Sequence, residues 1–201
     1  MKKRDIILSM GIGACMALLL FFIAKNTGVQ IPFFWILFFA LPLLSAFGMT
    51  LAHLIARKIP FVLQTAKFLL IGALNTLIDL GILNLFIYTS GIASGTWFVV
   101  FKGVSFTGAV LNSYAWNKFW TFQKKTGATP QKTGKEFLQF LLVSGIGFFI
   151  NVGTASIAAN VIGPQFGLSA NLWANASALF ATALSLVWNF AGYKLLVFKN
   201  S

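Results

Sequence analysis

The stretch "FLLIGALNTLIDLGILNLFI", residues 68–87, contains a single charged residue, Asp79, in an otherwise mostly apolar run. A helix of about 20 residues crosses a hydrocarbon core of about 30 Å. Comparable runs occupy residues 6–24, 33–54, 97–117, 137–160 and 172–192. The sequence therefore predicts an all-α integral membrane protein with six transmembrane helices.

The composition supports the same fold class. Hydrophobic residues fill 58% of the 201 positions and charged residues only 9%, which is too little polar surface to cover a soluble globule. The only cysteine is Cys15 and the only histidine is His53, so disulfides and clustered metal ligands are excluded. A lone histidine at the end of a span is more often structural than functional. We expect neither an enzyme nor a bound cofactor.

Basic residues divide unequally between the two sides of the predicted membrane. Thirteen of the fifteen Lys and Arg residues fall on the side of the two termini, if Lys67 is placed in the loop before residue 68, and only Lys25 falls on the other side. The positive-inside rule therefore predicts cytoplasmic termini in the cytoplasmic membrane. The net charge of +12 also attracts anionic lipid headgroups, so membrane lipids are expected partners. Nucleic acid is not expected, because no nucleic-acid module is present.

Residues 1–26 have the basic start and apolar body of a secretory signal peptide. The apolar body is long for such a peptide, however, and no A-x-A-like cleavage site follows it. We predict a retained first helix, which forms an N-terminal two-helix membrane hairpin, residues 1–63, with the second span.

The remaining four spans contain an internal repeat. "KFLLIGALNTLIDL" from Lys67 resembles "QFLLVSGIGFFINV" from Gln139, which begins 72 residues later. "YAWNKFWTF", which ends at Phe122, resembles "FAGYKLLVF", which ends 76 residues later at Phe198. The pattern predicts two copies of one helical hairpin, arranged as parallel repeats about an axis along the membrane normal.

Small and polar residues recur at helical spacing on one face of each of these four spans. These residues are Gly72, Asn75, Thr76 and Asp79; Lys102, Ser105, Ala109, Asn112 and Trp116; Ser144, Gly147, Asn151 and Thr154; and Asn171, Asn175, Ala178, Thr182, Ser185 and Asn189. One interpretation is close helix packing, with amides that hydrogen-bond across the contacts. The other is that the polar faces contact a substrate.

Asp79 and Lys102 are the two charged residues inside the predicted spans. A charge at that depth costs several kcal/mol unless it is paired or hydrated. Their depths differ by about 5 to 6 Å at 1.5 Å per residue, which a lysine side chain can bridge. They form either a structural ion pair or a site in which Lys102 meets an anionic substrate and Asp79 positions it.

The fourth span ends in "LNSYAWNKFWTFQKK", residues 111–125. We expect Trp116 and Trp120 to lie at the level of the lipid headgroups, where amphipathic rings are favoured. Anchorage explains the tryptophans and lysines but not both Asn112 and Asn117. A lysine such as Lys118 can bind phosphate as a point charge, and the amides can bind phosphate or sugar oxygens.

The stretches "FLLIGALNTLIDLGILNLFI" and "FKGVSFTGAVLNSYAWNKFWTFQ" resemble the GtrA-like family of small four-helix membrane proteins. The resemblance covers about residues 64–199, which gives a GtrA-like four-helix domain at 64–201, and it is weaker in the second hairpin. It implies translocation of polyprenyl-phosphate-linked sugars for cell-surface glycosylation. Residues that fit the family pattern are Asp79, Lys102, Asn112, Asn117, Lys118, Trp120, Phe122, Lys194 and Phe198.

Residues and resemblance together predict a facilitated flippase for a polyprenyl-phosphate-linked sugar, used in polysaccharide or glycan synthesis. The candidate substrate-binding residues are Asn75, Asp79, Lys102, Asn112, Trp116, Asn117, Lys118, Asn151, Asn189 and Lys194. The alternatives are a membrane partner of a glycosyltransferase, docked through residues 118–136, and a small proton-linked exporter that uses Asp79. A homo-oligomer is compatible with each reading.

Overall fold

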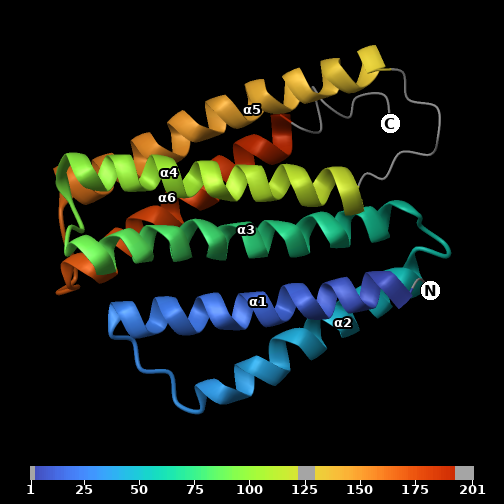
Figure 1. The fold of residues 1–201 in the computed structure, drawn as a ribbon, viewed down its shortest axis with the longest axis horizontal. Helices are drawn as coiled ribbons and strands as arrows, with labels where there is room; N and C mark the ends of the chain where they lie inside the picture. The colour runs from blue at the N-terminus through green and yellow to red at the C-terminus, as the bar shows by residue number, and fades with distance from the viewer. Residues whose placement is uncertain (1–2, 122–129, 193–201) are drawn as a thin grey trace. The chain divides into compact units, whose positions relative to one another are not determined.

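The structure is a computed structural model that describes residues 3–121 and 130–192. The long helices are α1 (Lys3–Thr27), α2 (Leu37–Ile55), α3 (Phe61–Ser90), α4 (Gly95–Trp116), α5 (Pro130–Ser156) and α6 (Ala170–Gly192) (Figure 1). The short segments are a 3₁₀ turn, η1 (Phe34–Ile36), and two π-helical turns, η2 (Asn117–Thr121) and η3 (Ile157–Ile162). No strand occurs in the described residues, and the all-α class is confirmed.

Five helices in the described part of the chain are long and apolar enough to cross a membrane. They are α1, α2 with η1, α3, α6 and the segment Leu138–Ile162 from α5 and η3. The chain is therefore an all-α multi-pass membrane protein. The helix outside this group, α4, is 22 residues long and carries Lys102 and several polar residues, so its membrane crossing stays a prediction.

The start of α3 differs from the predicted span. The helix begins at Phe61, directly after Pro60, rather than at residue 68. Lys67 was predicted to lie in a loop, and this was wrong, because Lys67 lies within α3 and is buried. Gln64, Thr65 and Lys67 interrupt the apolar residues at the start of α3, so the continuous apolar run begins only after Lys67 although the helix begins earlier.

Contacts group the chain into two compact units. The first is Met1–Gly81 with Leu111–Gln123, and the second is Ile82–Val110 with Lys124–Ser201. These two units are defined by residue contacts and do not follow the predicted domains. The predicted division into residues 1–63 and 64–201 therefore stays a prediction.

In the first unit, α1 and α2 form a closely packed pair (Figure 1). A Cβ on Gly13 of α1 would lie 2.5 Å from the carbonyl oxygen of Leu41 in α2, so only glycine allows this approach. An apolar core consists of Ile12, Met49, Ile71, Leu74 and Trp120. The core therefore joins the first two helices to α3 and to the end of α4.

In the second unit, α5 and α6 form a packed hairpin (Figure 1). Trp188 Nε1 of α6 donates a hydrogen bond to the carbonyl oxygen of Val143 at 3.1 Å, and Trp173 Nε1 donates to that of Ala158 at 2.8 Å. The two indole N–H groups of α6 thus form hydrogen bonds with backbone carbonyl groups of α5 and η3. Phe86 of α3 stacks on Phe101 of α4 with ring centroids 4.9 Å apart, which shows that these two helices also pack together.

The two hairpins bury equivalent positions. Ile71, Asp79, Leu80, Leu83 and Ile87 of α3 are buried, and so are the residues 72 positions later, Val143, Asn151, Val152, Ala155 and Ala159. Phe98, Lys102, Ser105 and Ala109 of α4 are buried, and so are the residues 76 positions later, Ala174, Ala178, Ala181 and Ser185. These positions agree with the predicted repeat, whereas Leu74 is buried and Ile146, 72 positions later, is exposed. The arrangement of the two hairpins as parallel repeats stays a prediction.

The first prediction tests the membrane topology. In a Cys15→Ala background, Ser94→Cys in the turn after α3 and Gln131→Cys at the start of α5 should react with impermeant thiol reagents from opposite sides of the membrane. The positive-inside rule places the second label in the cytoplasm. Labelling of both sites from the same side in sealed vesicles would contradict the six-span topology.

Candidate functional site

Several predicted substrate-binding amides hydrogen-bond to polar side chains of a neighbouring helix. In the first unit, Asn112 Nδ2 of α4 donates a hydrogen bond to Asn75 Oδ1 of α3 at 2.6 Å. In the second unit, Asn151 Nδ2 of α5 donates to Thr182 Oγ1 at 3.2 Å and to Ser185 Oγ at 3.1 Å, both on α6. These amides serve helix packing, as amides between membrane helices commonly do.

Two amide oxygens of the α5–α6 hairpin are buried without a hydrogen-bond partner among the residues that the structure describes. They belong to Asn151 and Asn189, both among the predicted site residues. A Cβ on Gly147 would lie 2.5 Å from Asn189 Oδ1, so the glycine leaves the space that this oxygen uses. A buried acceptor that lacks a donor costs about 1–3 kcal/mol. These two oxygens are therefore ready to accept hydrogen bonds from a hydroxyl or amide donor.

One amide pair was missed by the sequence reasoning. Asn84 Nδ2 of α3 donates to Asn175 Oδ1 of α6 at 2.5 Å, and Asn175 Nδ2 donates back to Asn84 Oδ1 at 3.1 Å. Asn175 belongs to the polar face predicted for the sixth span, whereas Asn84 lies five residues after Asp79, off the face predicted for the third. The two-way pair joins the hairpins through their asparagines.

Asp79 and Lys102 are both buried, with 2% and 0% of their surface exposed. Burial on the inner face of a helix keeps both charges away from lipid, as intramembrane charges require. The two residues belong to different compact units, and each makes polar or electrostatic interactions. Their mutual pairing stays a prediction.

The end of α4 has the least regular backbone of the predicted site. Asn117–Thr121 form the π-helical turn η2, and such turns occur frequently at functional sites. Asn117 Nδ2 donates to Ser113 Oγ at 3.2 Å. Within the described part of the chain, Asn117 Oδ1 and Thr121 Oγ1 are buried without a hydrogen-bond partner. The ring of Trp116 meets that of Trp120 edge to face at 5.6 Å.

Two predicted lysines are not fully placed. The backbone of Lys118 lies in η2, but its side chain is outside the described part of the structure. Lys194 lies outside the described residues altogether. Their roles stay predictions.

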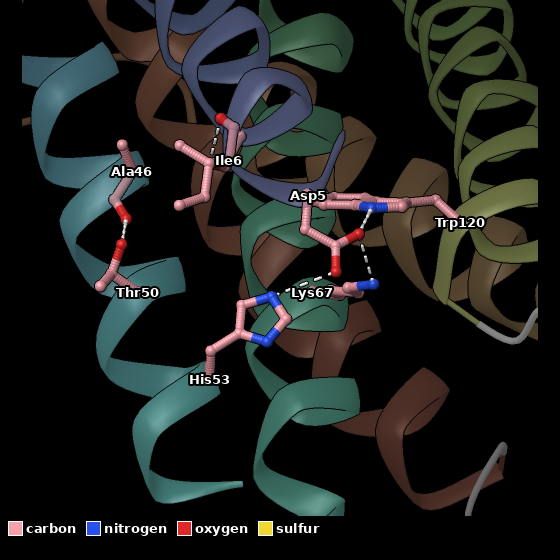
Figure 2. Close-up of polar contacts among 8 residues, drawn as sticks. Asp5, Ile6, Ala46, Thr50, His53, Lys67 and Trp120 are labelled. Carbon is pink, nitrogen blue, oxygen red and sulfur yellow. Dashed lines mark hydrogen bonds and ion pairs between the residues drawn. The ribbon is translucent and has the colours of Figure 1, made fainter. Parts of the chain in front are cut away.

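Trp120, which is expected at the level of the lipid headgroups, is buried within the protein, with only 3% of its surface exposed. Its depth in the membrane stays a prediction. Its Nε1 donates a hydrogen bond to Asp5 Oδ1 at 2.8 Å, and Lys67 Nζ donates to the same oxygen at 2.8 Å (Figure 2). His53 Nε2 lies 3.2 Å from Asp5 Oδ2. We call these four residues, Asp5, His53, Lys67 and Trp120, the Asp5 cluster.

The Asp5 cluster contains two charged residues, Asp5 and Lys67, that the sequence places outside the predicted spans. Asp79 and Lys102 are the only charged residues of the predicted spans, whereas the structure also buries Asp5 in α1 and Lys67 in α3. Lys67 Nζ also lies 5.2 Å from the centroid of a Trp120 ring, within cation–π range. The cluster thus ties α1, α2, α3 and η2 together in the first unit.

The second prediction concerns the amide pair between α3 and α6. Asn84→Leu should lower the stability in detergent by about 1 kcal/mol, because it leaves the amide of Asn175 without its partner. The double variant Asn84→Leu/Asn175→Leu should recover part of that loss. Strictly additive losses, measured by thermal unfolding with Leu85→Ala as an exposed control, would contradict the pairing.

Comparison with known proteins places the chain in a family. The model of the GtrA/DPMS transmembrane domain matches residues 67–198. The chain is similar to "Uncharacterized membrane protein YngA" of Bacillus subtilis (strain 168), with 30% identity over 139 residues that cover 67% of this chain and 79% of the relative. No solved structure gave a significant match. Because the matched region contains α3, α4, α5 and α6 almost entirely, the chain belongs to the GtrA/DPMS transmembrane-domain family.

Proposed function

We propose that the protein facilitates the flipping of a polyprenyl-phosphate-linked sugar across the cytoplasmic membrane for the synthesis of cell-surface glycans. The observation that carries the proposal is the GtrA/DPMS transmembrane domain at residues 67–198, in a chain built of membrane-length helices. The resemblance of this domain to GtrA-like proteins implies a lipid-linked sugar as the substrate. The buried polar helix faces supply groups that such a headgroup needs.

The end of α4 is the proposed entry for the headgroup. Lys118 supplies a positive charge for the phosphate. Asn117 Oδ1, which is buried and has no partner among the described residues, accepts a hydrogen bond from a sugar hydroxyl. Lys194 is the matching basic residue after α6 in the second repeat. The isoprenoid tail stays in lipid throughout, so only the headgroup needs a polar route.

The interior of the second unit supports such a route. Asn151 and Asn189 hold buried acceptor oxygens that have no hydrogen-bond partner among the described residues. Lys102 contributes a buried positive charge in α4. The bundle needs only to lower the cost of moving a polar headgroup through hydrocarbon, and the concentration gradient of the lipid provides the direction.

Reconstitution in liposomes tests the proposal. Purified protein should accelerate the movement of a polyprenyl-phosphate-linked sugar between leaflets, measured by the access of an impermeant enzyme to the sugar. If lipid does not move but a glycosyltransferase is bound and retained, the protein is a membrane partner of that enzyme. If a cation moves with protons instead, it is an exporter.

The third prediction concerns η2. The double variant Asn117→Ala/Lys118→Ala should transport the lipid-linked sugar at least tenfold more slowly, because the phosphate loses about 1.4 kcal/mol or more of stabilisation at the entry. Expression and thermal stability should remain nearly unchanged. Lys58→Ala, which removes an exposed basic residue from the turn before α3, is the matched control. Normal transport by the double variant would assign this turn to anchorage.

The fourth prediction separates structure from binding at Asp79 and Lys102. If Lys102 contacts the phosphate, Lys102→Ala should fold but transport poorly, and Asp79→Ala/Lys102→Ala should stay inactive even where its stability recovers. In a purely structural pair, each single variant loses about 3–5 kcal/mol by leaving one buried charge unpaired, and the double variant regains it. Ser105→Ala is the control on the same face of α4. A stable double variant with full transport would show that the two residues have only a structural role.

A further inference from the structure

We propose that Lys67 and the indole N–H of Trp120 form a binding site for a phosphate anion. The carboxylate of Asp5, which belongs to the same chain, occupies this site and competes with the phosphate for it. The phosphate belongs to a monoester or diester headgroup or to a free phosphate in solution. The inference rests on the proposed function only for the identity of the lipid that carries the phosphate.

The donor geometry carries the proposal. Lys67 Nζ and Trp120 Nε1 both donate to one oxygen, Asp5 Oδ1, at 2.8 Å each (Figure 2). The ammonium and the indole have only donors, so neither can satisfy the other. Both residues are buried, with 9% and 3% of their surface exposed. This pair of donors therefore requires an anionic acceptor, and a phosphate oxygen meets that requirement as well as a carboxylate oxygen does.

The competitor and the donors come from different parts of the chain. Lys67 and Trp120 lie within residues 67–198, which match the family model, whereas Asp5 lies in α1 outside that match. The donor pair is thus part of the family domain, and the carboxylate is supplied by an added helix. Exchange of the carboxylate for a phosphate keeps the buried lysine paired with an anion, so the exchange avoids an unpaired buried charge.

Two further contacts hold the competitor in place. His53 Nε2 of α2 lies 3.2 Å from Asp5 Oδ2, the oxygen that the donor pair does not use. Arg4 Nη2 donates to the carbonyl oxygen of Phe119 in η2 at 3.3 Å. His53 and Arg4 are therefore positioning residues for Asp5. Asp5 itself lies in the first turn of α1, where a helix can open at little cost.

The experiment measures phosphate binding directly in the full chain. Wild-type protein and Asp5→Asn are placed in phosphatidylcholine nanodiscs with polyprenyl phosphate, or with polyprenol, and binding is followed by tryptophan fluorescence. Inorganic phosphate is titrated separately against nanodiscs without either lipid. Glu136→Gln in α5, which is not part of the cluster, is the matched control, since it raises the net charge by the same amount.

Asp5→Asn should bind polyprenyl phosphate about tenfold more tightly than wild type, a gain of about 1.4 kcal/mol, because the competing charge is gone. The control should bind like wild type, and polyprenol should not bind to the donor pair. Adding Lys67→Gln or Trp120→Phe to Asp5→Asn should abolish the gain. A gain with inorganic phosphate alone would identify the ligand as free phosphate, and a gain with the lipid alone would identify it as the headgroup.

A folded Asp5→Asn that binds neither probe more tightly than the control would overturn the proposal. If Asp5→Asn does not fold, Asp5→Asn/Lys67→Gln replaces it, because a neutral amide pair leaves no buried charge. Polyprenyl phosphate binding by that variant tighter than that of wild type would overturn the proposal equally. If Asp5→Asn binds the phosphate more tightly but no variant transports the lipid-linked sugar, this site stands and the flippase function is rejected. If the lipid-linked sugar is transported but Asp5→Asn does not change phosphate binding, only this site is rejected.

Discussion

The structure depends on the absence of water from the hydrocarbon around its helices. In such surroundings a polar side chain must find its partner within the protein, because an unsatisfied group costs several kcal/mol. The pairs Asn75–Asn112 and Asn84–Asn175 meet this requirement by joining one helix to another. The amide nitrogen of Asn151 meets it with two hydroxyls of α6, whereas the amide oxygen has no partner among the described residues. The polar residues therefore fix which helix faces meet, while the apolar residues fill the remaining space or face lipid.

The fold could be predicted from the sequence because its main signals are local. Length and hydropathy located the helices, and the repeat predicted which residues are equivalent. Asp79 and Asn151, which the repeat aligns, are both buried, and so are Lys102 and Ala178. The ends of the helices were predicted less accurately. The first residues of α3 and α5 lie outside the apolar runs, where hydropathy carries no information about helical structure.

The site was predicted less completely, because its contacts join distant residues. Lys67 and Trp120 contact Asp5 across 62 and 115 positions of sequence, and nothing near either residue indicates this. A lysine before an apolar run and a tryptophan after one are both typical of membrane anchorage, so the local pattern favoured the wrong environment. One signal was present: Asp5 is an acid within a basic start, and the chain has only three acids.

A buried ion pair is weak support for stability, because desolvation of both charges offsets most of their attraction. An apolar contact among α1, α3 and η2 would hold the first unit together at least as well, and Ile12, Met49, Ile71 and Leu74 already provide one beside Trp120. Stability alone therefore does not explain why Asp5 and Lys67 are charged. A charged pair differs from an apolar contact in that one of its members can be exchanged for another ion. Because η2 contains both Trp120 and the proposed entry residue Asn117, such an exchange would be transmitted to the entry through a turn of five residues.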